Sequence, residues 1–279
     1  MDPVFLYPAA AAQMVMERRM ETITNNIANA ETTGFRRDIP IFATKIAPFA
    51  KMHSRGGVPD LTGASAMFPV PVLGGASDPT GGNSILPIPS YPLLDELVVD
   101  FRQGAVHVTG NPLDIAIDGK SFFQIQTVNG VRYTRNGSFR LSSEGQLVTQ
   151  NGEPVLGEGG PIKLPQGFIM VDHEGKITMK GNDGGAPVGV DVFAMVDVAD
   201  PSKMKKVGNN LFELVGEAAT VSEMPHLHQG SLEASNVDPL YEMISMISAM
   251  RNYESVQKAI QGADDISLKN VNQVGQLKA

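Results

Sequence analysis

The two ends of the chain share one design, a long amphipathic pattern that begins at an Asp-Pro pair. After Asp2–Pro3, apolar residues recur at steps of three and four up to Ala30, which is the spacing of one face of an α-helix. Asp238–Pro239 opens a second such pattern. Asp is a favoured N-cap and Pro suits the first helical position, so we expect helices over residues 2–30 and from 239 to about residue 275.

These apolar stripes need a covering surface, because a long amphipathic helix is not stable alone in water. The simplest partner for each helix is the other one, but a pair buries only one face of each. We therefore expect the ends to become well ordered only where neighbouring copies add contacts. The expected assembly interface consists of Met16, Met20, Ile23, Ile27, Leu240, Met243, Ile244, Ile247, Met250 and Tyr253. Methionine suits an interface between slightly different neighbours because its side chain adapts its shape, although ordinary core filling explains these methionines equally well.

Two unlike regions lie between the ends. Residues 36–97 are rich in Gly, Pro and Ser without helical or strand periodicity, so we expect an extended linker or insert there. Residues 98–230 contain short β-favouring runs, such as SFFQIQT and KITMK, with three Asn-Gly pairs among them. Asn-Gly is a strong hairpin signal. The expected fold class is α+β, with an all-β domain of short antiparallel strands between paired terminal helices (residues 1–35 with 231–279).

Composition narrows the function classes. The net charge of −8 argues against wholesale nucleic-acid binding, and the basic run Lys203, Lys205 and Lys206 is typical of a solvated turn. No apolar run approaches the roughly 18 residues of a membrane span. The N-terminus is apolar before it is charged, the reverse of a secretory signal, so we expect any export to proceed without a cleaved leader.

No catalytic or cofactor-binding constellation stands out, so the chain is not expected to be an enzyme, and we expect no cofactor or metal. The sequence has no GxxxxGK[ST] loop and no GxSxG elbow. Asp114 and Asp118 would lie about 13 Å apart on one strand face, too far for the roughly 5–9.5 Å of paired glycosidase carboxylates. His226 and His228 form an HxH pair, but a stable metal site needs three or four ligands. We interpret them as surface residues.

Several motifs carry a resemblance to a known family. They are NNIANAETTGFR (25–36), TGNPLDIAIDGKSFFQIQ (109–126), YTRNGSFRLSSEGQLVTQNGEPVLG (133–157), SLEASNVDPLYEM (231–243) and MRNYESVQKAI (250–260). Together they resemble the flagellar rod and hook proteins, the axial proteins of the bacterial flagellum, and are most similar to the proximal-rod members. The terminal motif residues are Asn25, Asn26, Asn29, Thr33, Gly34, Phe35 and Asn236. We expect Asn25, Asn26 and Asn29 to make polar contacts or caps near the end of the first helix, and Gly34 to permit a sharp chain reversal after it.

The resemblance implies a structural role. In this family the terminal helices pair as the inner wall of a helical tube, the β domain lies outside, and exported proteins pass through the central channel. The implied partners are further copies of the chain, neighbouring proximal- and distal-rod subunits and the flagellar export apparatus. The implied location is the periplasmic rod of the basal body, reached without a cleaved signal peptide.

Two alternatives remain open at this point. The Gly/Pro-rich residues 48–94 depart from the usual family connection, and distal-rod proteins carry an extra segment in that place, so a distal-rod or hook subunit is one alternative. The other is a secreted carbohydrate-active β protein with helical arms. The absence of Trp and an aromatic share of only 6% supply few residues for stacking on a sugar.

Overall fold

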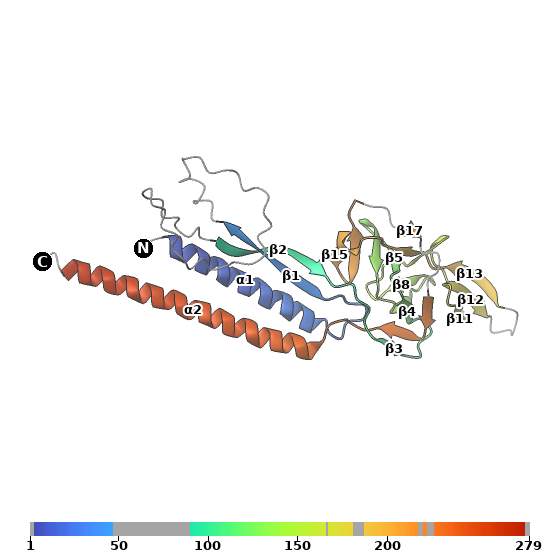
Figure 1. Ribbon diagram of the computed structural model, residues 1–279. Coiled ribbons are helices and arrows are strands. Elements are labelled where there is room, and N and C mark those ends of the chain that lie inside the picture. Colours follow the sequence, from blue (N-terminus) through green and yellow to red (C-terminus); the bar gives the residue numbers. More distant parts are fainter. Residues whose placement is uncertain are drawn as a thin grey trace, which may run out of the picture. The chain divides into compact units, whose positions relative to one another are not determined.

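The structure is a computed structural model that describes residues 3–46, 90–165, 167–180, 187–216, 220–221 and 226–276. Helix α1 spans Pro3–Ala28 and helix α2 spans Pro239–Gln276. Strands occupy most of the described chain between the two helices (Figure 1).

The chain divides into two compact units. The terminal unit comprises Met1–Arg18, Ile41–Asp95 and Arg251–Ala279, and the β unit comprises Arg19–Pro40 and Glu96–Met250. The β unit therefore contains the last turns of α1 and the first turns of α2 together with the β domain.

Both helices lie within two residues of their predicted bounds where the structure describes them. Asp238 caps α2, because its Oδ1 accepts hydrogen bonds from the backbone N–H groups of Leu240 at 3.0 Å and Tyr241 at 3.2 Å. Helix α1 ends at Ala28, and the N–H of Asn29 still donates to Asn25 O at 3.2 Å. The predicted cap Asp2 lies outside the described residues.

The β domain is built from short strands that fall on the β-favouring runs of the sequence. Their bounds are β3 Val106–Val108, β4 Ile115–Asp118, β5 Phe122–Thr127, β6 Gly130–Thr134, β7 Phe139–Leu141, β8 Leu147–Thr149, β9 Leu156–Gly157, β10 Gly160–Pro161, β11 Phe168–Val171, β12 Lys176–Lys180, β13 Val188–Val192, β14 Met195–Asp197, β15 Met204–Gly208, β16 Leu211–Leu214, β17 Thr220–Val221, β18 His226–Gln229 and β19 Ser231–Glu233. A 3-10 turn, Pro201–Lys203, precedes β15.

The described strand pairs of the β domain are antiparallel. The largest sheet has the order β15-β16-β6-β5-β14-β17. A three-stranded sheet has the order β11-β12-β13 (Figure 1). The smaller pairs are β18-β4, β19-β3, β7-β8 and β10-β9. The β5–β6 hairpin pairs Thr127 with Gly130, whose φ is +105°. The Asn-Gly pair at 129–130 therefore lies at a hairpin turn, as predicted.

Alternation along β5 supplies two hydrophobic clusters. Phe123 and Ile125 are fully buried in the larger cluster, which contains side chains from β4, β7, β8, β12 and β14. Phe122 points the other way, into a second cluster with Phe212 and Val196. Successive side chains of a strand leave opposite faces of a sheet, so this one strand stabilises both cores.

The expectation for residues 36–97 is wrong at both ends of that range. Strand β1 occupies Asp38–Ile46 and strand β2 occupies Ser90–Val99, and the two form a two-stranded sheet. The expectation rested on the Gly, Pro and Ser content of this range. Pro40 and Pro92 lie within these strands, but each strand of a two-stranded sheet is an edge strand, where proline is tolerated. Residues 47–89 of the expected linker lie outside the described part of the chain.

The architecture is thus mostly β, with one helix before the β domain and one after it. Among the helices that the structure describes, none combines the length and apolar character of a membrane span.

A close backbone contact at Gly137 gives a test of the β domain. A Cβ atom at Gly137 would lie 1.7 Å from the carbonyl oxygen of Ile115, at the start of β4. We expect Gly137→Ala to lower the free energy of unfolding by at least about 2–3 kcal/mol, because the strand must shift to relieve the overlap. Urea titration followed by circular dichroism measures this change.

The matched control is Gly189→Ala in β13. Its nearest contact would be Lys176 Cε at 3.6 Å, an ordinary distance, so its effect on stability should stay within about 1 kcal/mol. Equal effects of the two substitutions would contradict the described contact.

Candidate functional site

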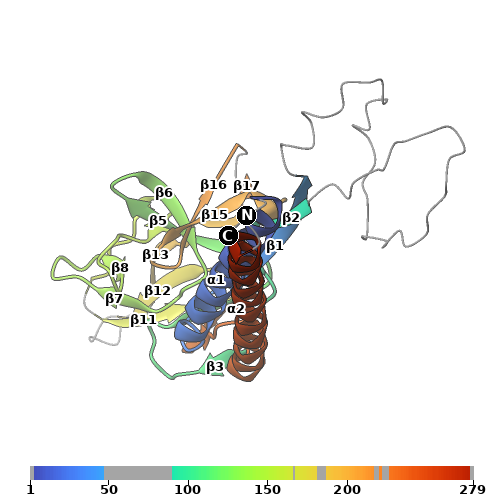
Figure 2. The same ribbon diagram turned by 90° about the vertical axis from the view of Figure 1, so that its left-hand side faces the viewer.

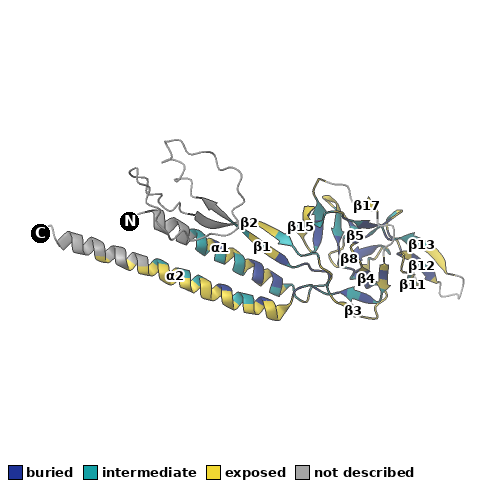
Figure 3. Ribbon diagram, viewed as in Figure 1, coloured by how far each residue is buried: buried dark blue, intermediate teal, exposed yellow. Residues whose placement is uncertain are grey.

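An apolar stripe lies exposed on the first turns of α2. The exposed fractions are 68% for Leu240, 50% for Met243, 57% for Ile244, 53% for Ile247 and 50% for Met250. Figure 3 shows the exposed residues along this helix. Steps of three and four place these side chains on one helix face, so the described part of the chain leaves a continuous apolar surface uncovered. Below, these five residues are called the α2 stripe.

A different face of the same turns is buried. Glu242 is 1% exposed and Ala249, seven residues later, is 0% exposed. Two helical turns separate them, and the half-buried Met246 lies between them on this face. The residues of the α2 stripe lie on a different side of the helix.

The expected interface residues of α1 lie in a more covered setting. Ile23 is buried at 4% exposed, while Met16, Met20 and Ile27 are half-buried. Tyr253 of α2 is also half-buried, and its hydroxyl accepts a hydrogen bond from Gln13 Nε2 at 2.8 Å. The ten expected residues thus separate into an exposed stripe on α2 and a set that is already partly covered.

The turn after α1 is locked against the β domain. Gly34 has φ +67°, and a Cβ atom there would lie 2.6 Å from the backbone nitrogen of Asn136. Its N–H donates to Glu233 O at 2.8 Å. Only glycine combines a left-handed conformation with so close a backbone contact. Phe35 beside it is buried at 5% exposed, and Thr33 Oγ1 lies 2.9 Å from Asn136 Oδ1.

Two asparagines of the terminal motifs bind main chain. Asn26 is 1% exposed, and its side chain donates to Asp38 O and accepts from Asp38 N–H, both at 2.9 Å. Asn236 Oδ1 accepts from Arg37 N–H at 2.7 Å, and its Nδ2 donates to Asp100 O at 2.7 Å and Arg102 O at 2.9 Å. These carboxamides join segments that are distant in sequence. They make the polar contacts that we expected of Asn26, although its partner is the next strand rather than the end of its own helix.

A buried ion cluster joins the segment after α1 to the strand before α2. Arg36 Nη1 lies 2.6 Å from Glu233 Oε1, and both side chains are 0% exposed. Arg135 Nη1 lies 3.7 Å from Glu233 Oε2, and Gly104 N–H donates to Oε1 at 2.9 Å. Burial lowers the pKa of Arg135 to about 10, and the charge of Glu233 opposes that shift. We call Arg36, Arg135 and Glu233 the buried ion cluster.

Further ion pairs surround this cluster. Arg37 Nε lies 2.5 Å from Glu242 Oε1 in the first turn of α2. Lys206 Nζ lies 2.8 Å from Asp38 Oδ1 and 4.0 Å from the centre of the Phe35 ring. Burial lowers the pKa of Lys206, although its hydrogen bond with Asp38 opposes the shift. The expectation of a solvated turn is therefore wrong for Lys206, whose stem is covered by this junction.

The polar junction consists of the buried ion cluster, the ion pairs around it and the two asparagines. Sequence reasoning missed most of its charged members, namely Arg36, Arg37, Asp38, Arg135, Lys206, Glu233 and Glu242. A charged residue is expected to be exposed to solvent when only the sequence is known. The residues that pair with each other in this junction also lie far apart along the chain. The only available signal was the density of charge in FRRD (35–38) beside a family motif.

The residues considered for catalysis or metal binding do not converge. In the described residues, no group of three or more His, Asp or Glu side chains has the arrangement of a metal site. His228 Nε2 lies 4.0 Å from Asp118 Oδ2, with both side chains largely exposed. Asp114 is used locally, because its carboxylate accepts hydrogen bonds from Thr109 Oγ1 at 2.7 Å and Asn111 Nδ2 at 3.0 Å.

Comparison with known proteins places the chain among flagellar proteins. A family model described as "Flagella basal body rod protein" matches residues 6–36, the "Flagellar hook protein FlgE/F/G D1 domain" matches residues 116–179, and the "Flagellar basal body rod FlgEFG protein C-terminal" matches residues 228–274. These matches contain α1 with its turn, much of the β domain, and α2.

Whole-chain relatives agree with these matches. The flagellar basal-body rod protein FlgF of Caulobacter vibrioides is 34% identical over 278 residues, which cover 98% of each chain. The FlgF of Mesorhizobium japonicum is 30% identical over 90% of this chain and 89% of its own. The flagellar basal-body rod protein FlgG of Bacillus subtilis is 31% identical over 96% of this chain and 97% of its own.

The buried ion cluster makes a stability prediction. Glu233→Gln leaves two guanidinium groups in the interior without their carboxylate, and we expect the free energy of unfolding to fall by about 3–5 kcal/mol. Chemical denaturation of the purified chain measures this loss.

Glu213→Gln serves as the control for this test. Glu213 Oε1 lies 3.2 Å from Arg132 Nη1, and the Glu213 side chain is 40% exposed, so its loss should change stability by no more than about 1 kcal/mol. If Glu233→Gln were as harmless as Glu213→Gln, the cluster would not hold the junction together.

Proposed function

Because this chain belongs to the flagellar basal-body rod protein family, we propose that it is a structural subunit of the proximal rod, of the FlgF type. The rod subunit polymerises into a helical tube, transmits torque and encloses the export channel. The observation that carries this proposal is the α2 stripe, a run of large apolar side chains that the described subunit leaves exposed. Such a surface on a soluble protein marks a contact with another molecule, and no enzymatic role is proposed.

The terminal helices are proposed to pair within each subunit, as the assembly domain. The last turns of α1 and the first turns of α2 run side by side in both views (Figures 1 and 2), and Asn26 Nδ2 lies 3.5 Å from Glu242 Oε1. In the terminal unit, Gln13 and Tyr253 supply a further hydrogen bond between the helices. Pairing through this buried face keeps the α2 stripe available for neighbouring subunits.

The polar junction suits a subunit that carries mechanical load. Arg36 and Glu233 tie the segment after α1 to strand β19, and Arg37 ties it to the first turn of α2. A buried charge must lie beside its opposite charge, so these ion pairs permit fewer geometries than an apolar contact does. We propose that this junction fixes the direction in which α2 leaves the β domain, so that force on one element reaches the other.

The partners follow from the same role. We propose that the α2 stripe and the half-covered positions Met16, Met20, Ile27 and Tyr253 contact further copies of this chain and the neighbouring proximal- and distal-rod subunits. The β domain then forms the outer surface of the tube. Delivery through the flagellar export apparatus to the periplasmic rod belongs to this proposal.

A distal-rod role is the second candidate, because FlgG proteins match almost the full chain as well. Position within the basal body discriminates the two. A tag on the chain, located by electron microscopy in purified basal bodies, should lie on the membrane-proximal part of the rod. A tag at the level of the outer rings would favour the distal rod.

A charge in the α2 stripe tests the proposed interface. Ile247 is 53% exposed in the subunit, so Ile247→Asp should leave folding intact, yet burying a carboxylate between subunits costs several kcal/mol. We expect the loss of swimming and of rods that contain the chain, with an unchanged circular dichroism spectrum of the purified subunit.

Asn252→Asp is the matched control, an exposed residue of the same helix that lies off the stripe. It adds the same charge and should preserve motility. Normal swimming of the Ile247→Asp strain would count against the stripe as an assembly surface.

A further inference from the structure

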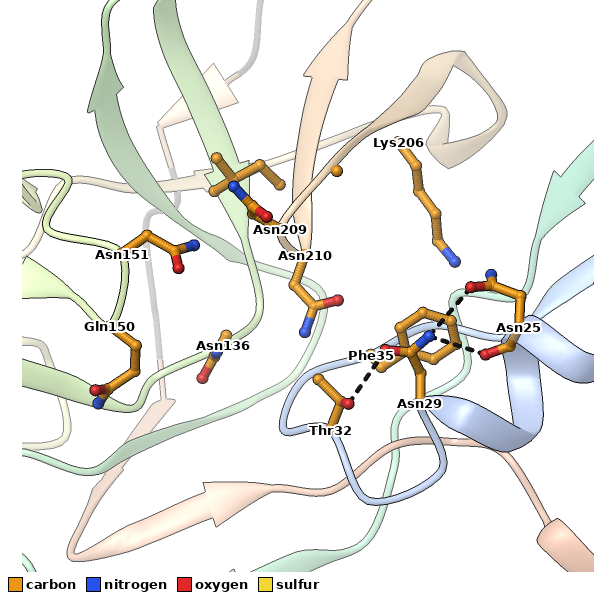
Figure 4. A pocket seen from close by; sticks show the side chains of 12 residues that line it. Asn25, Asn29, Thr32, Phe35, Asn136, Gln150, Asn151, Lys206, Asn209 and Asn210 are labelled. Atoms are coloured by element: carbon orange, nitrogen blue, oxygen red, sulfur yellow. Dashed lines mark hydrogen bonds between the residues drawn. The ribbon is translucent and has the colours of Figure 1, made fainter.

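A pocket lies where the turn after α1 faces the β domain (Figure 4). Its volume is about 430 Å³, within the roughly 300–1,000 Å³ range of ligand pockets. Residues of the helix end and turn form one part of the wall, among them Asn25, Asn29 and Phe35. Loops of the β domain form the other part and contribute the carboxamides Asn136, Gln150, Asn151, Asn209 and Asn210.

The two parts of the wall differ in unused hydrogen-bonding capacity. On the helix side, Asn29 donates to Asn25 O at 2.8 Å and accepts from Thr32 Oγ1 at 3.2 Å, so its carboxamide is occupied. On the β side, the carboxamides of Asn151 and Asn209 have no hydrogen-bond partner among the described residues. Gln150 donates to Ser138 while its Oε1 remains available. The unused groups of the pocket are therefore neutral donors and acceptors on the β side.

The turn that presents Asn209 is conformationally fixed. Asn209 and Asn210 have φ values of 51° and 57° between the paired residues Gly208 and Leu211. Two left-handed residues in a two-residue hairpin loop are typical of a type I′ turn, which favours Asn. Asn210 Nδ2 also donates to Thr33 O at 3.0 Å. The backbone that carries the Asn209 carboxamide is therefore fixed by the turn between β15 and β16.

The pocket offers no charge to a ligand. Lys206, the cation among the lining residues that the structure describes, is paired with Asp38 and also donates to Arg36 O at 2.5 Å. Among the described residues of the wall there is no carboxylate. An anionic ligand would find no free cation and a metal ion would find no carboxylate, so the chemistry favours a neutral ligand.

The pocket also lacks a stacking surface for a sugar. Phe35, the aromatic residue in the wall, is only 5% exposed and has the Lys206 ammonium 4.0 Å from its ring centre. Sugar recognition commonly uses an aromatic face, and here that face is occupied. A neutral ligand with alternating N–H and C=O groups remains the best match.

Carboxamides elsewhere in this chain already bind such groups. Asn26 pairs with both the N–H and the C=O of Asp38. Gln229 donates to Pro112 O at 2.9 Å and Ile169 O at 3.0 Å and accepts from Val171 N–H at 3.1 Å. A peptide group and a carboxamide have the same donor and acceptor pair, so the free carboxamides of Asn151 and Asn209 fit main chain as well.

We propose that this pocket binds the main chain of an extended, uncharged segment of a neighbouring subunit in the assembled rod. The identity of the partner as a rod subunit rests on the proposed function, whereas the preference for uncharged main chain rests on the pocket alone. Asn151 and Asn209 are the residues that bind it, and Asn210 and Gln150 complete the wall.

A photocrosslinker tests this contact in cells that assemble flagella. p-Benzoylphenylalanine replaces Asn151, and the adduct is identified by mass spectrometry of purified basal bodies. We expect one peptide of a rod subunit that lacks charged residues at the crosslinked position. The same crosslinker at Val128, a fully exposed residue of the β5–β6 turn, should not give this peptide.

Asn209→Gly provides the second arm, because glycine keeps the left-handed turn and removes only the carboxamide. It should lower the yield of the Asn151 adduct at least about fivefold, as expected for the loss of one or two hydrogen bonds. If the crosslinker at position 151 prevents rod entry, the same probe at Gln150 replaces it.

The outcomes separate this inference from the proposed function. Rods that contain the chain but give no peptide adduct from either position, or give an adduct with a glycan, overturn the pocket inference alone. An adduct whose yield is unchanged by Asn209→Gly also overturns it. Absence of the unsubstituted chain from purified rods overturns the proposed function instead.

Discussion

The carboxylate of Glu233 is buried beside the guanidinium groups of Arg36 and Arg135, and the arrangement of segments within the β unit depends on this cluster. Arg36 follows α1, Arg135 follows β6, and Glu233 ends the strand that leads toward α2. A buried ion pair adds little net stability, but the loss of one partner is costly. The cluster therefore acts less as a source of stability than as a requirement that three distant segments meet in one arrangement.

Around that arrangement, the polar and apolar parts of the chain have separate roles. The polar junction works within the subunit, where Asn26, Asn236 and Arg37 bind strands and helix ends to each other. The five apolar side chains of the α2 stripe are exposed at fractions of 50% and more. If α2 packed its apolar face against its own β domain, no apolar surface would be left for contact with a neighbouring subunit. In this chain a polar contact, the ion pair of Glu242 with Arg37, attaches the first turn of α2 instead.

Local sequence signals predicted the positions of the helices and turns well, but contacts between residues far apart in the sequence could not be predicted. Asp238 and Pro239 marked the start of α2 to the residue, and the glycine at 34 marked the reversal after α1, because each depends on a few adjacent residues. Strands β1 and β2 were missed because their prolines are acceptable only once the strands are known to be edges. The pairing of Arg36 with Glu233 could not be predicted, because nothing in the sequence around either residue distinguishes a buried charge from a solvated one.

The make-up of the α2 stripe also sets the thermal behaviour of any polymer that it holds together. Its five side chains carry no charge, so their association gains from the release of ordered water rather than from Coulomb attraction. That driving force weakens on cooling and responds little to ionic strength. A filament joined chiefly through these residues would loosen in the cold while it withstands high salt, the opposite of one joined through surface ion pairs.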